Sequence, residues 1–107
     1  ATIDNGCLWA KPGGHKTSLR SRFKRKYNGG TEMEILDDAP FSLDGMVPLE
    51  VKKGTCIVLH GLLPHYSLPN TSGKSRPAYS IHTVDPKCFY PKDNWLQRSG
   101  ELELRGF

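Results

Sequence analysis

Residues 58–76 read VLHGLLPHYSLPNTSGKSR, in which the turn-forming segment PNTSGKS separates two more regular runs. Its Pro, Asn, Ser and Gly residues predict two neighbouring strands joined by a short connection. If the loop comprises residues 69–72, His65 pairs with Arg76 and both side chains point to one face. Ser67 shares that face, because side chains two residues apart in a strand point the same way. The stretch therefore predicts an imidazole, a hydroxyl and a guanidinium in one patch.

The rest of the chain has the same organisation of short strands and turns. It contains 11 Gly and 8 Pro, and no stretch has the periodicity of an amphipathic helix. Residues 55–60, TCIVLH, form a continuous apolar run that is typical of a strand buried on both faces. Pro48 confines its own strand to a sheet edge or a bulge. We expect strands at residues 6–10, 32–36, 46–51, 55–60, 64–68 and 76–84.

Short strands at close spacing predict an all-β sandwich or barrel. A length of 107 residues suits a single domain or part of one, and it is too short to close a jelly roll of about eight strands. We expect loops at residues 12–30 and 37–45 and an irregular tail at 85–107, from which Trp95 and Leu96 dock on the body. The opening residues lack an initiator Met and the features of a signal peptide. We therefore expect the chain to be the C-terminal portion of a longer protein.

The basic residues are unevenly placed in a chain of net charge +4, with five cations among the seven residues 20–26, RSRFKRK. One interpretation is an anionic partner, such as a nucleic acid, a membrane surface or a phosphorylated substrate. The other is a solvated loop, which we favour because the sequence has no second basic cluster and no nucleic-acid-binding motif. We accordingly expect a small-molecule partner rather than a nucleic acid or a membrane, and the sequence leaves the oligomeric state open.

Three widely spaced cysteines, Cys7, Cys56 and Cys88, include no C-x-x-C pair. Their odd number predicts reduced thiols and an intracellular compartment, for which we expect the cytoplasm. Residues 105–107, Arg-Gly-Phe, do not match a Ser-Lys-Leu peroxisomal address, but a peroxisomal location stays open.

A zinc site built from Cys56, His60 and His65 is a weak alternative, because a closed structural site needs a fourth ligand and usually tighter spacing. We expect Cys56 to pack as a small apolar residue in its strand. We expect His60 to be structural and hydrogen-bonded within the sheet, and we assign no role to His82.

The trio predicted by residues 58–76 has a chemical use. Neutral imidazole binds iron, zinc or copper, so His65 is a candidate metal ligand. Arg76 offers a planar fork that matches a carboxylate, and Ser67 adds a further hydrogen bond. A dicarboxylate such as 2-oxoglutarate could therefore reach from a ferrous iron on His65 to Arg76. That iron site needs two His and one carboxylate, and none of the four histidines is followed by an acid two residues on.

Three ordered segments resemble the phytanoyl-CoA dioxygenase family. Residues 4–16, DNGCLWAKPGGHK, resemble its NGCLW-x-x-PGSH segment, and residues 47–82 resemble its last core strands. Residues 94–97, NWLQ, resemble the tail of one branch of the family. The resemblance implies an Fe(II)- and 2-oxoglutarate-dependent dioxygenase on a double-stranded β-helix, a cupin-like jelly roll. The chain would be the C-terminal part of that fold.

The resemblance also implies roles for individual residues. His65 matches the distal iron-ligand histidine, Arg76 the arginine that binds the far carboxylate of 2-oxoglutarate, and Ser67 its hydroxyl helper. Trp9 matches a tryptophan that lines the cosubstrate pocket. We predict no catalytic residue beyond the metal site. The His-x-Asp ligands would precede Ala1, so we expect this chain alone to be inactive.

The full-length protein would hydroxylate an organic substrate, and an acyl-CoA is one option. The alternative is a non-catalytic β domain, truncated or metal-free, that binds an anionic partner.

Overall fold

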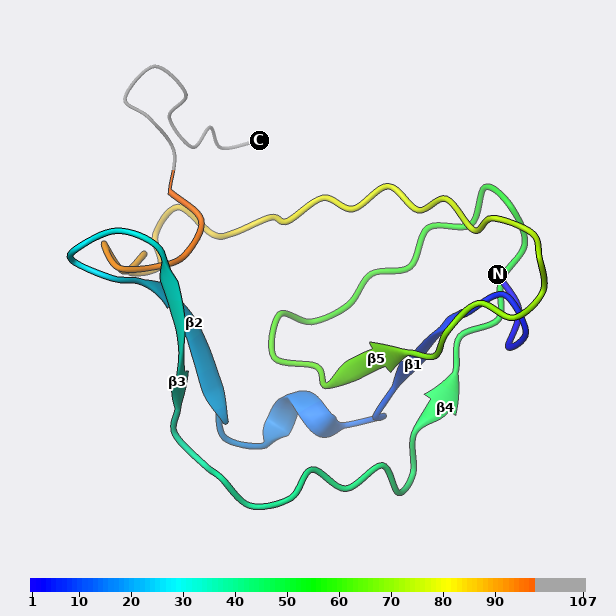
Figure 1. Cartoon of the computed structure of the whole chain (residues 1–107), viewed down its shortest axis with the longest axis horizontal. Coiled ribbons are helices and arrows are strands. Elements are labelled where there is room, and N and C mark those ends of the chain that lie inside the picture. Colours follow the sequence, from blue (N-terminus) through cyan, green and yellow to red (C-terminus); the bar gives the residue numbers. More distant parts are fainter. Residues whose placement is uncertain (98–107) are drawn as a thin grey trace. The chain divides into compact units, whose positions relative to one another are not determined.

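The structure is a computed structural model, and it describes residues 1–97 (Figure 1). These residues belong to two compact units, which we call unit 1 and unit 2. Unit 1 consists of Ala1–Ser18 and Ala39–Tyr79, and unit 2 consists of Leu19–Asp38 and the segment that starts at Ser80. The regular elements are β1 (Leu8–Ala10), the 3-10 helix η1 (Gly14–Lys16), β2 (Ser21–Arg25), β3 (Thr31–Ile35), β4 (Val47–Pro48) and β5 (His65–Ser67).

The predicted all-β class is confirmed, because residues 1–97 form strands and a single turn of 3-10 helix. Closure into a double-stranded β-helix stays a prediction. Among the described residues, no helix has the length and hydrophobicity of a membrane span.

Unit 1 is built on a three-stranded antiparallel sheet in the order β4-β1-β5. The central strand β1 comes from the apolar run GCLWA, and its partners each contribute only two or three residues. Pro48 lies in the edge strand β4, as its missing N–H predicts. Trp9 pairs with Pro48 on one side and with Tyr66 on the other. The register thus brings residues from the start, middle and later part of the chain into one sheet.

Close backbone contacts fix the entry to β1. Cys7 is fully buried, and Ala10 is 4% exposed. The preceding residue, Gly6, has φ +77°, and a Cβ there would lie 2.8 Å from the carbonyl oxygen of Leu68. Only glycine therefore lets the chain after β5 pass this close to the start of β1.

η1 packs against the segment that leads into β5. A Cβ on the buried Gly14 would meet Pro64 Cδ at 2.9 Å, and the N–H of Lys11 donates to the carbonyl of Pro64 over 3.1 Å. The hydroxyl of Thr17 closes η1 by donating to the carbonyl of Gly14. The predicted turn at Pro12-Gly13-Gly14 is thus also a packing surface for the approach to β5.

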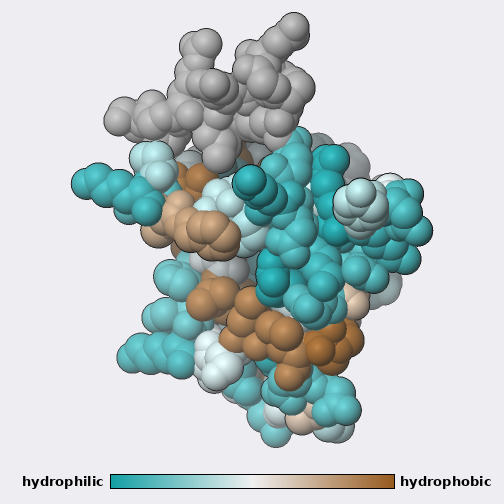
Figure 2. Space-filling view, turned by 90° about the vertical axis from the view of Figure 1, so that its left-hand side faces the viewer, coloured by the Kyte–Doolittle hydropathy of each residue, from teal (hydrophilic) through white to brown (hydrophobic). Residues whose placement is uncertain are grey.

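Unit 2 contains the hairpin β2-β3, whose register runs from Ser21↔Ile35 to Arg25↔Thr31. Gly29 and Gly30 both have positive φ and form its turn. The hairpin carries an exposed apolar pair, Phe23 opposite Met33. Figure 2 shows hydrophobic side chains exposed beside hydrophilic ones.

The segment before residue 98 docks on β2, which confirms the contact predicted for Trp95. The Trp95 ring lies 5.9 Å from the ring of Phe23, and the backbone N–H of Trp95 donates to the carbonyl of Phe23. The amide of Arg25 donates to the carbonyl of Asp93 over 2.7 Å. The irregular tail was predicted at residues 85–107. Its last part, residues 98–107, lies outside the described residues.

The structure differs from the predicted loop at residues 12–30, because this range includes η1 and β2. In RSRFKRK, basic residues alternate with Ser21 and Phe23. This alternation suits a strand if a partner strand supplies opposite charges. β3 is that partner, and it supplies Glu32 and Glu34. The composition of this segment indicated a loop, because it shows the basic residues of the segment but not the acidic residues that pair with them.

The strands predicted at residues 55–60 and 76–84 do not form in the described residues. Cys56 is exposed rather than packed, and Val58 is 90% exposed. An apolar run becomes a strand only when a neighbouring segment pairs its N–H and C=O groups and covers its side chains. Within residues 1–97, no segment pairs with 55–60.

Candidate functional site

β5 places His65 and Ser67 on one face of the unit 1 sheet. They lie two residues apart, opposite Ala10 and Leu8 respectively, and both are exposed. β5 is an edge strand of the sheet formed by the described residues. The predicted neighbourhood of an imidazole and a hydroxyl therefore exists, on a sheet edge that is open to further groups.

The His65 ring is oriented by its own backbone. Its Nδ1 lies 2.8 Å from the carbonyl oxygen of Leu63. A carbonyl oxygen only accepts hydrogen bonds, so in this contact Nδ1 holds the proton and donates. In the neutral ring, Nε2 then keeps its lone pair. Metal-ligating histidines usually donate their second ring N–H to an acceptor of this kind, so the contact is compatible with a ligand role.

Arg76 lies in irregular backbone, so its predicted pairing with His65 is wrong. β5 pairs with β1 instead, and beyond β5 the N–H of Thr71 donates to the carbonyl of Asp4 over 2.9 Å. The guanidinium is half-buried, and its Nε is buried without a hydrogen-bond partner within the described part of the chain.

The turn predicted between β5 and Arg76 is confirmed. The Asn70 side chain accepts from the N–H of Ser72 and donates to the carbonyl of Lys74 over 2.6 Å. Gly73 takes the positive φ that the turn requires. The turn therefore has the form that its residues predict. Thr71 of the turn is hydrogen-bonded to Asp4 of the N-terminal segment, so the chain does not return alongside β5.

Trp9 lies on the opposite face of the sheet from His65 and Ser67, because it pairs with Tyr66. The two rings are stacked, with centroids 6.1 Å apart and an interplanar angle of 15°. The indole Nε1 is buried and has no hydrogen-bond partner in residues 1–97. Trp9 therefore joins β1 to β5 and keeps one unused donor.

The sequence interpretation missed a pair of histidines in unit 1. The rings of His15, on η1, and His60 lie 4.9 Å apart. His60 is exposed and lies in a turn rather than in the buried strand predicted for it, and its Nδ1 accepts from the N–H of Leu62 over 3.1 Å. Gly61 and Pro64 mark the turn that follows His60, but they do not indicate that its ring meets His15.

Potential metal ligands are sparse in residues 1–97, where no group of three or more His, Cys, Asp or Glu residues comes together. The three cysteines are free thiols. An iron site of the predicted kind needs two His and one carboxylate, so His65 alone does not complete one.

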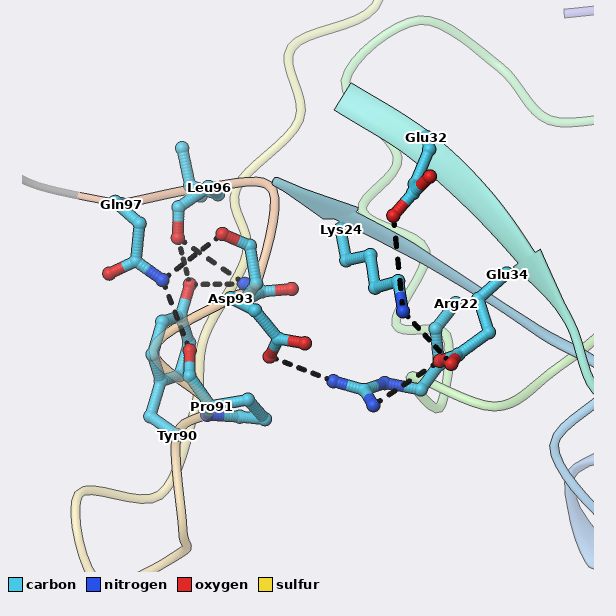
Figure 3. Close-up of polar contacts among 10 residues, drawn as sticks. Arg22, Lys24, Glu32, Glu34, Tyr90, Pro91, Asp93, Leu96 and Gln97 are labelled. Atoms are coloured by element: carbon cyan, nitrogen blue, oxygen red, sulfur yellow. Dashed lines mark hydrogen bonds and ion pairs between the residues drawn. The ribbon is translucent and has the colours of Figure 1, made fainter. Parts of the chain in front are cut away.

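The basic segment 20–26 is largely paired with acids of unit 2 (Figure 3). Arg22 contacts Glu34 at 3.4 Å and Asp93 at 3.0 Å. Lys24 contacts Glu34 at 2.9 Å and Glu32 at 4.0 Å. The hydrogen bond to Glu34 is the main cause that raises the pKa of Lys24 above its ordinary value.

Two other cations of the same segment also have partners. Arg20 pairs with Asp37 at 3.4 Å, and the Arg25 side chain donates to the carbonyl of Trp95. Because Arg20, Arg22 and Lys24 have acidic partners, the segment offers an anionic ligand less charge than its composition implies.

The residues before position 98 form a polar network next to this hairpin (Figure 3). The Tyr90 hydroxyl donates to the carbonyl of Leu96 over 2.7 Å, and the Asn94 amide donates to the Tyr90 oxygen. Gln97 donates to the carbonyls of Pro91 and Asn94. The NWLQ segment thus has a structural use, which is to hold this stretch in a fixed shape.

Comparison with known proteins gives consistent matches. Residues 1–78 match the family model described as Phytanoyl-CoA dioxygenase (PhyH). A phytanoyl-CoA dioxygenase of Arabidopsis thaliana is 46% identical over 103 residues, which are 92% of this chain and 35% of the relative. Phytanoyl-CoA dioxygenase 1 of Oryza sativa subsp. japonica is 46% identical over 102 residues, or 92% of this chain and 34% of the relative.

A third relative is the phytanoyl-CoA dioxygenase domain-containing protein 1 homolog of Dictyostelium discoideum. It is 41% identical over 102 residues, which are 91% of this chain and 36% of the relative. The chain therefore spans about a third of the length of the curated relatives that it matches. No solved structure matches.

Proposed function

The chain belongs to the phytanoyl-CoA dioxygenase family, and on that premise we propose that it is part of an Fe(II)- and 2-oxoglutarate-dependent dioxygenase. The proposed reaction converts 2-oxoglutarate, O₂ and an organic substrate with a C–H bond into succinate, CO₂ and the hydroxylated substrate. The proposed substrate is a small molecule, with an acyl-CoA as one class. The proposed location is intracellular.

The observation that carries the proposal is the state of the His65 ring. Its Nδ1–H donates to the carbonyl of Leu63, so Nε2 is available to an iron ion. His65 would be one ligand of that iron, which supplies oxygen activation when bound. The remaining His and carboxylate would come from residues outside this chain, and the chain alone would be inactive.

Arg76 and Ser67 would bind and orient the cosubstrate. Leaving a buried donor without a partner costs about 1–3 kcal/mol, and the Nε of Arg76 is such a donor. A carboxylate would remove that cost and would use the planar fork of the guanidinium. Ser67 lies on the same face as His65, so its hydroxyl would add a hydrogen bond to a ligand held there.

Trp9 would hold β1 and β5 together through its stacking on Tyr66. The resemblance puts Trp9 in the wall of the cosubstrate pocket, but its side chain lies on the sheet face opposite His65 and Ser67. We therefore propose no contact between Trp9 and a cosubstrate held at His65.

The test is turnover of 2-oxoglutarate by the intact protein that contains this chain. We expect succinate release that requires Fe(II), and an Arg76→Ala variant whose KM for 2-oxoglutarate rises about tenfold or more, because it loses charge-assisted hydrogen bonds. Lys74→Ala, which removes an exposed cation two residues away, is the matched control and should leave that KM unchanged. An unchanged KM in Arg76→Ala would reject the assignment of Arg76, and absence of Fe(II)-dependent succinate release would reject the function.

The alternative of a non-catalytic β domain with an anionic partner has less support. It relied on the basic segment 20–26, whose Arg20, Arg22 and Lys24 are paired with acids of the same unit.

A further inference from the structure

The carbonyl that orients His65 belongs to a turn that begins at His60. The N–H of Leu63 donates to the backbone carbonyl of His60 over 2.9 Å. The N–H of Leu62 donates to Nδ1 of the His60 side chain over 3.1 Å. Two hydrogen bonds to one residue therefore set the direction in which the Leu63 carbonyl points, and that carbonyl lies 2.8 Å from Nδ1 of His65.

The His60 ring is supported from outside the turn. It lies 4.9 Å from the ring of His15, at an interplanar angle of 40°. His15 is on η1, which is anchored to the far end of the same turn through the contact of Gly14 with Pro64. η1 thus touches this connection at both ends, next to His60 and at the residue before His65.

We propose that His60 is a positioning residue for His65: the acceptor nitrogen of its side chain fixes the turn that carries the Leu63 carbonyl, and through that carbonyl the tautomer of the His65 ring. This inference rests on the proposed function, because it assigns His60 to the metal-binding role of His65. His60 does not itself bind the metal. Its Nδ1 accepts from a backbone N–H, so in the neutral ring the proton is on Nε2.

His60 and His65 are five residues apart, and their hydrogen bonds give them different tautomers. His60 is an Nδ1 acceptor and has the Nε2–H tautomer, whereas His65 is an Nδ1 donor and has a free Nε2 lone pair. A side chain that accepts the N–H two residues later is the geometry of an Asx turn. Asn should therefore replace His60 in this role, whereas a ring without an acceptor should not.

Two variants of the intact protein separate the hydrogen bond from the ring contact. His60→Phe keeps an aromatic ring beside His15 but removes the acceptor. His60→Asn keeps an acceptor but removes the ring. His82→Phe and His82→Asn are matched controls at an exposed histidine in unit 2.

The readout is the tautomer of His65 in the metal-free protein, measured by long-range ¹H–¹⁵N correlation spectra of its ring. We expect His60→Phe to shift the tautomer ratio of His65 about fivefold toward Nε2–H, the effect of weakening one ordinary hydrogen bond. His60→Asn should retain the wild-type spectrum. Affinity for Co(II), used as a probe metal, should fall by at most about fivefold in His60→Phe, because it scales with the fraction of the competent tautomer, and it should recover in His60→Asn.

An unchanged His65 spectrum in His60→Phe would overturn the inference. Equal disturbance in both variants would also overturn it, because that result describes general loss of structure rather than loss of an acceptor. The spectrum is recorded without metal or cosubstrate, so it is independent of turnover. Failure of the intact wild-type protein to turn over 2-oxoglutarate rejects the proposed function, whereas a failed tautomer test rejects only the role of His60.

Discussion

The Nδ1 of His65 lies 2.8 Å from the carbonyl oxygen of Leu63, two residues earlier in the chain. The ring is therefore oriented by the backbone that leads into its own strand, and a partner strand is not needed to set it. This local contact leaves Nε2 free while β5 is still an edge strand. The relationship gives the first of four predictions.

Removing the His65 ring should weaken metal binding. His65→Leu deletes the Nε2 donor, so the affinity of the intact protein for Fe(II) or Co(II) should fall at least about tenfold. Anaerobic calorimetric titration measures the change. His82→Leu is the control for loss of an exposed histidine, and equal affinities for His65→Leu and wild type would contradict the ligand role.

Alanine at Gly6 should destabilise unit 1 more than alanine at comparable glycines. Gly6 combines φ +77° with a Cβ position 2.8 Å from Leu68 O. Gly54 has φ +88° with open space around it, and Gly14 has a contact with Pro64 but no positive φ. A left-handed conformation costs a residue with a Cβ about 1–2 kcal/mol, and the steric contact adds to that cost.

Denaturant unfolding of the three Gly→Ala variants checks this order. The free energy of unfolding should fall most for Gly6→Ala, with Gly54→Ala reporting the backbone cost alone. A Gly6→Ala variant no less stable than Gly54→Ala would show that the approach of Leu68 does not constrain this position.

The hairpin of unit 2 should lose part of its stability at high pH. The hydrogen bond to Glu34 raises the pKa of Lys24 above 10.5, so the charged form is favoured in the folded state. Its contribution is complete below the ordinary pKa of lysine and is lost as the pH rises through the raised value. Lys24→Met should lower the urea midpoint at pH 7, and the difference from wild type should shrink above pH 10.5. A difference that persists unchanged at high pH would assign the effect to packing of the lysine stem.

The basic segment should bind polyanions weakly, because Arg20, Arg22 and Lys24 have acidic partners. Five free cations on a single-stranded nucleic acid would give a slope of log K against log[salt] of about −3.5. We expect a much shallower slope for a single-stranded oligonucleotide, measured by fluorescence anisotropy between low and physiological salt. A slope near the full value would favour the anionic-partner alternative.

Several features of this fold follow from residues that are close in sequence. The turn at Asn70–Gly73 forms from its own side chains, and Pro48 lies in an edge strand because it lacks an N–H. The strands predicted around Trp9 and Tyr66 both formed, because their short apolar runs are bounded by glycine and proline. His65 and Ser67 share a face because side chains two residues apart in a strand point the same way.

The errors lie where pairing over long sequence distances decides the outcome. The run at residues 55–60 is the most apolar in the chain, yet no segment within residues 1–97 pairs with it. Segment 20–26 was expected in a loop, yet Glu32 and Glu34 of β3 neutralise its charges and allow a strand. Arg76 was expected opposite His65, but the segment after β5 is bound to Asp4 through Thr71 and does not pair with the open edge of β5.

The sequence alone determined the family, the β class and the turns, because motifs and turn residues act within a few positions of one another. The tertiary structure decided which runs became strands, which side of β5 is paired, and that the rings of His15 and His60 meet. Those outcomes depend on groups brought together in space from distant parts of the chain. A strand needs a partner for its N–H and C=O groups, and its own residues do not show where that partner comes from.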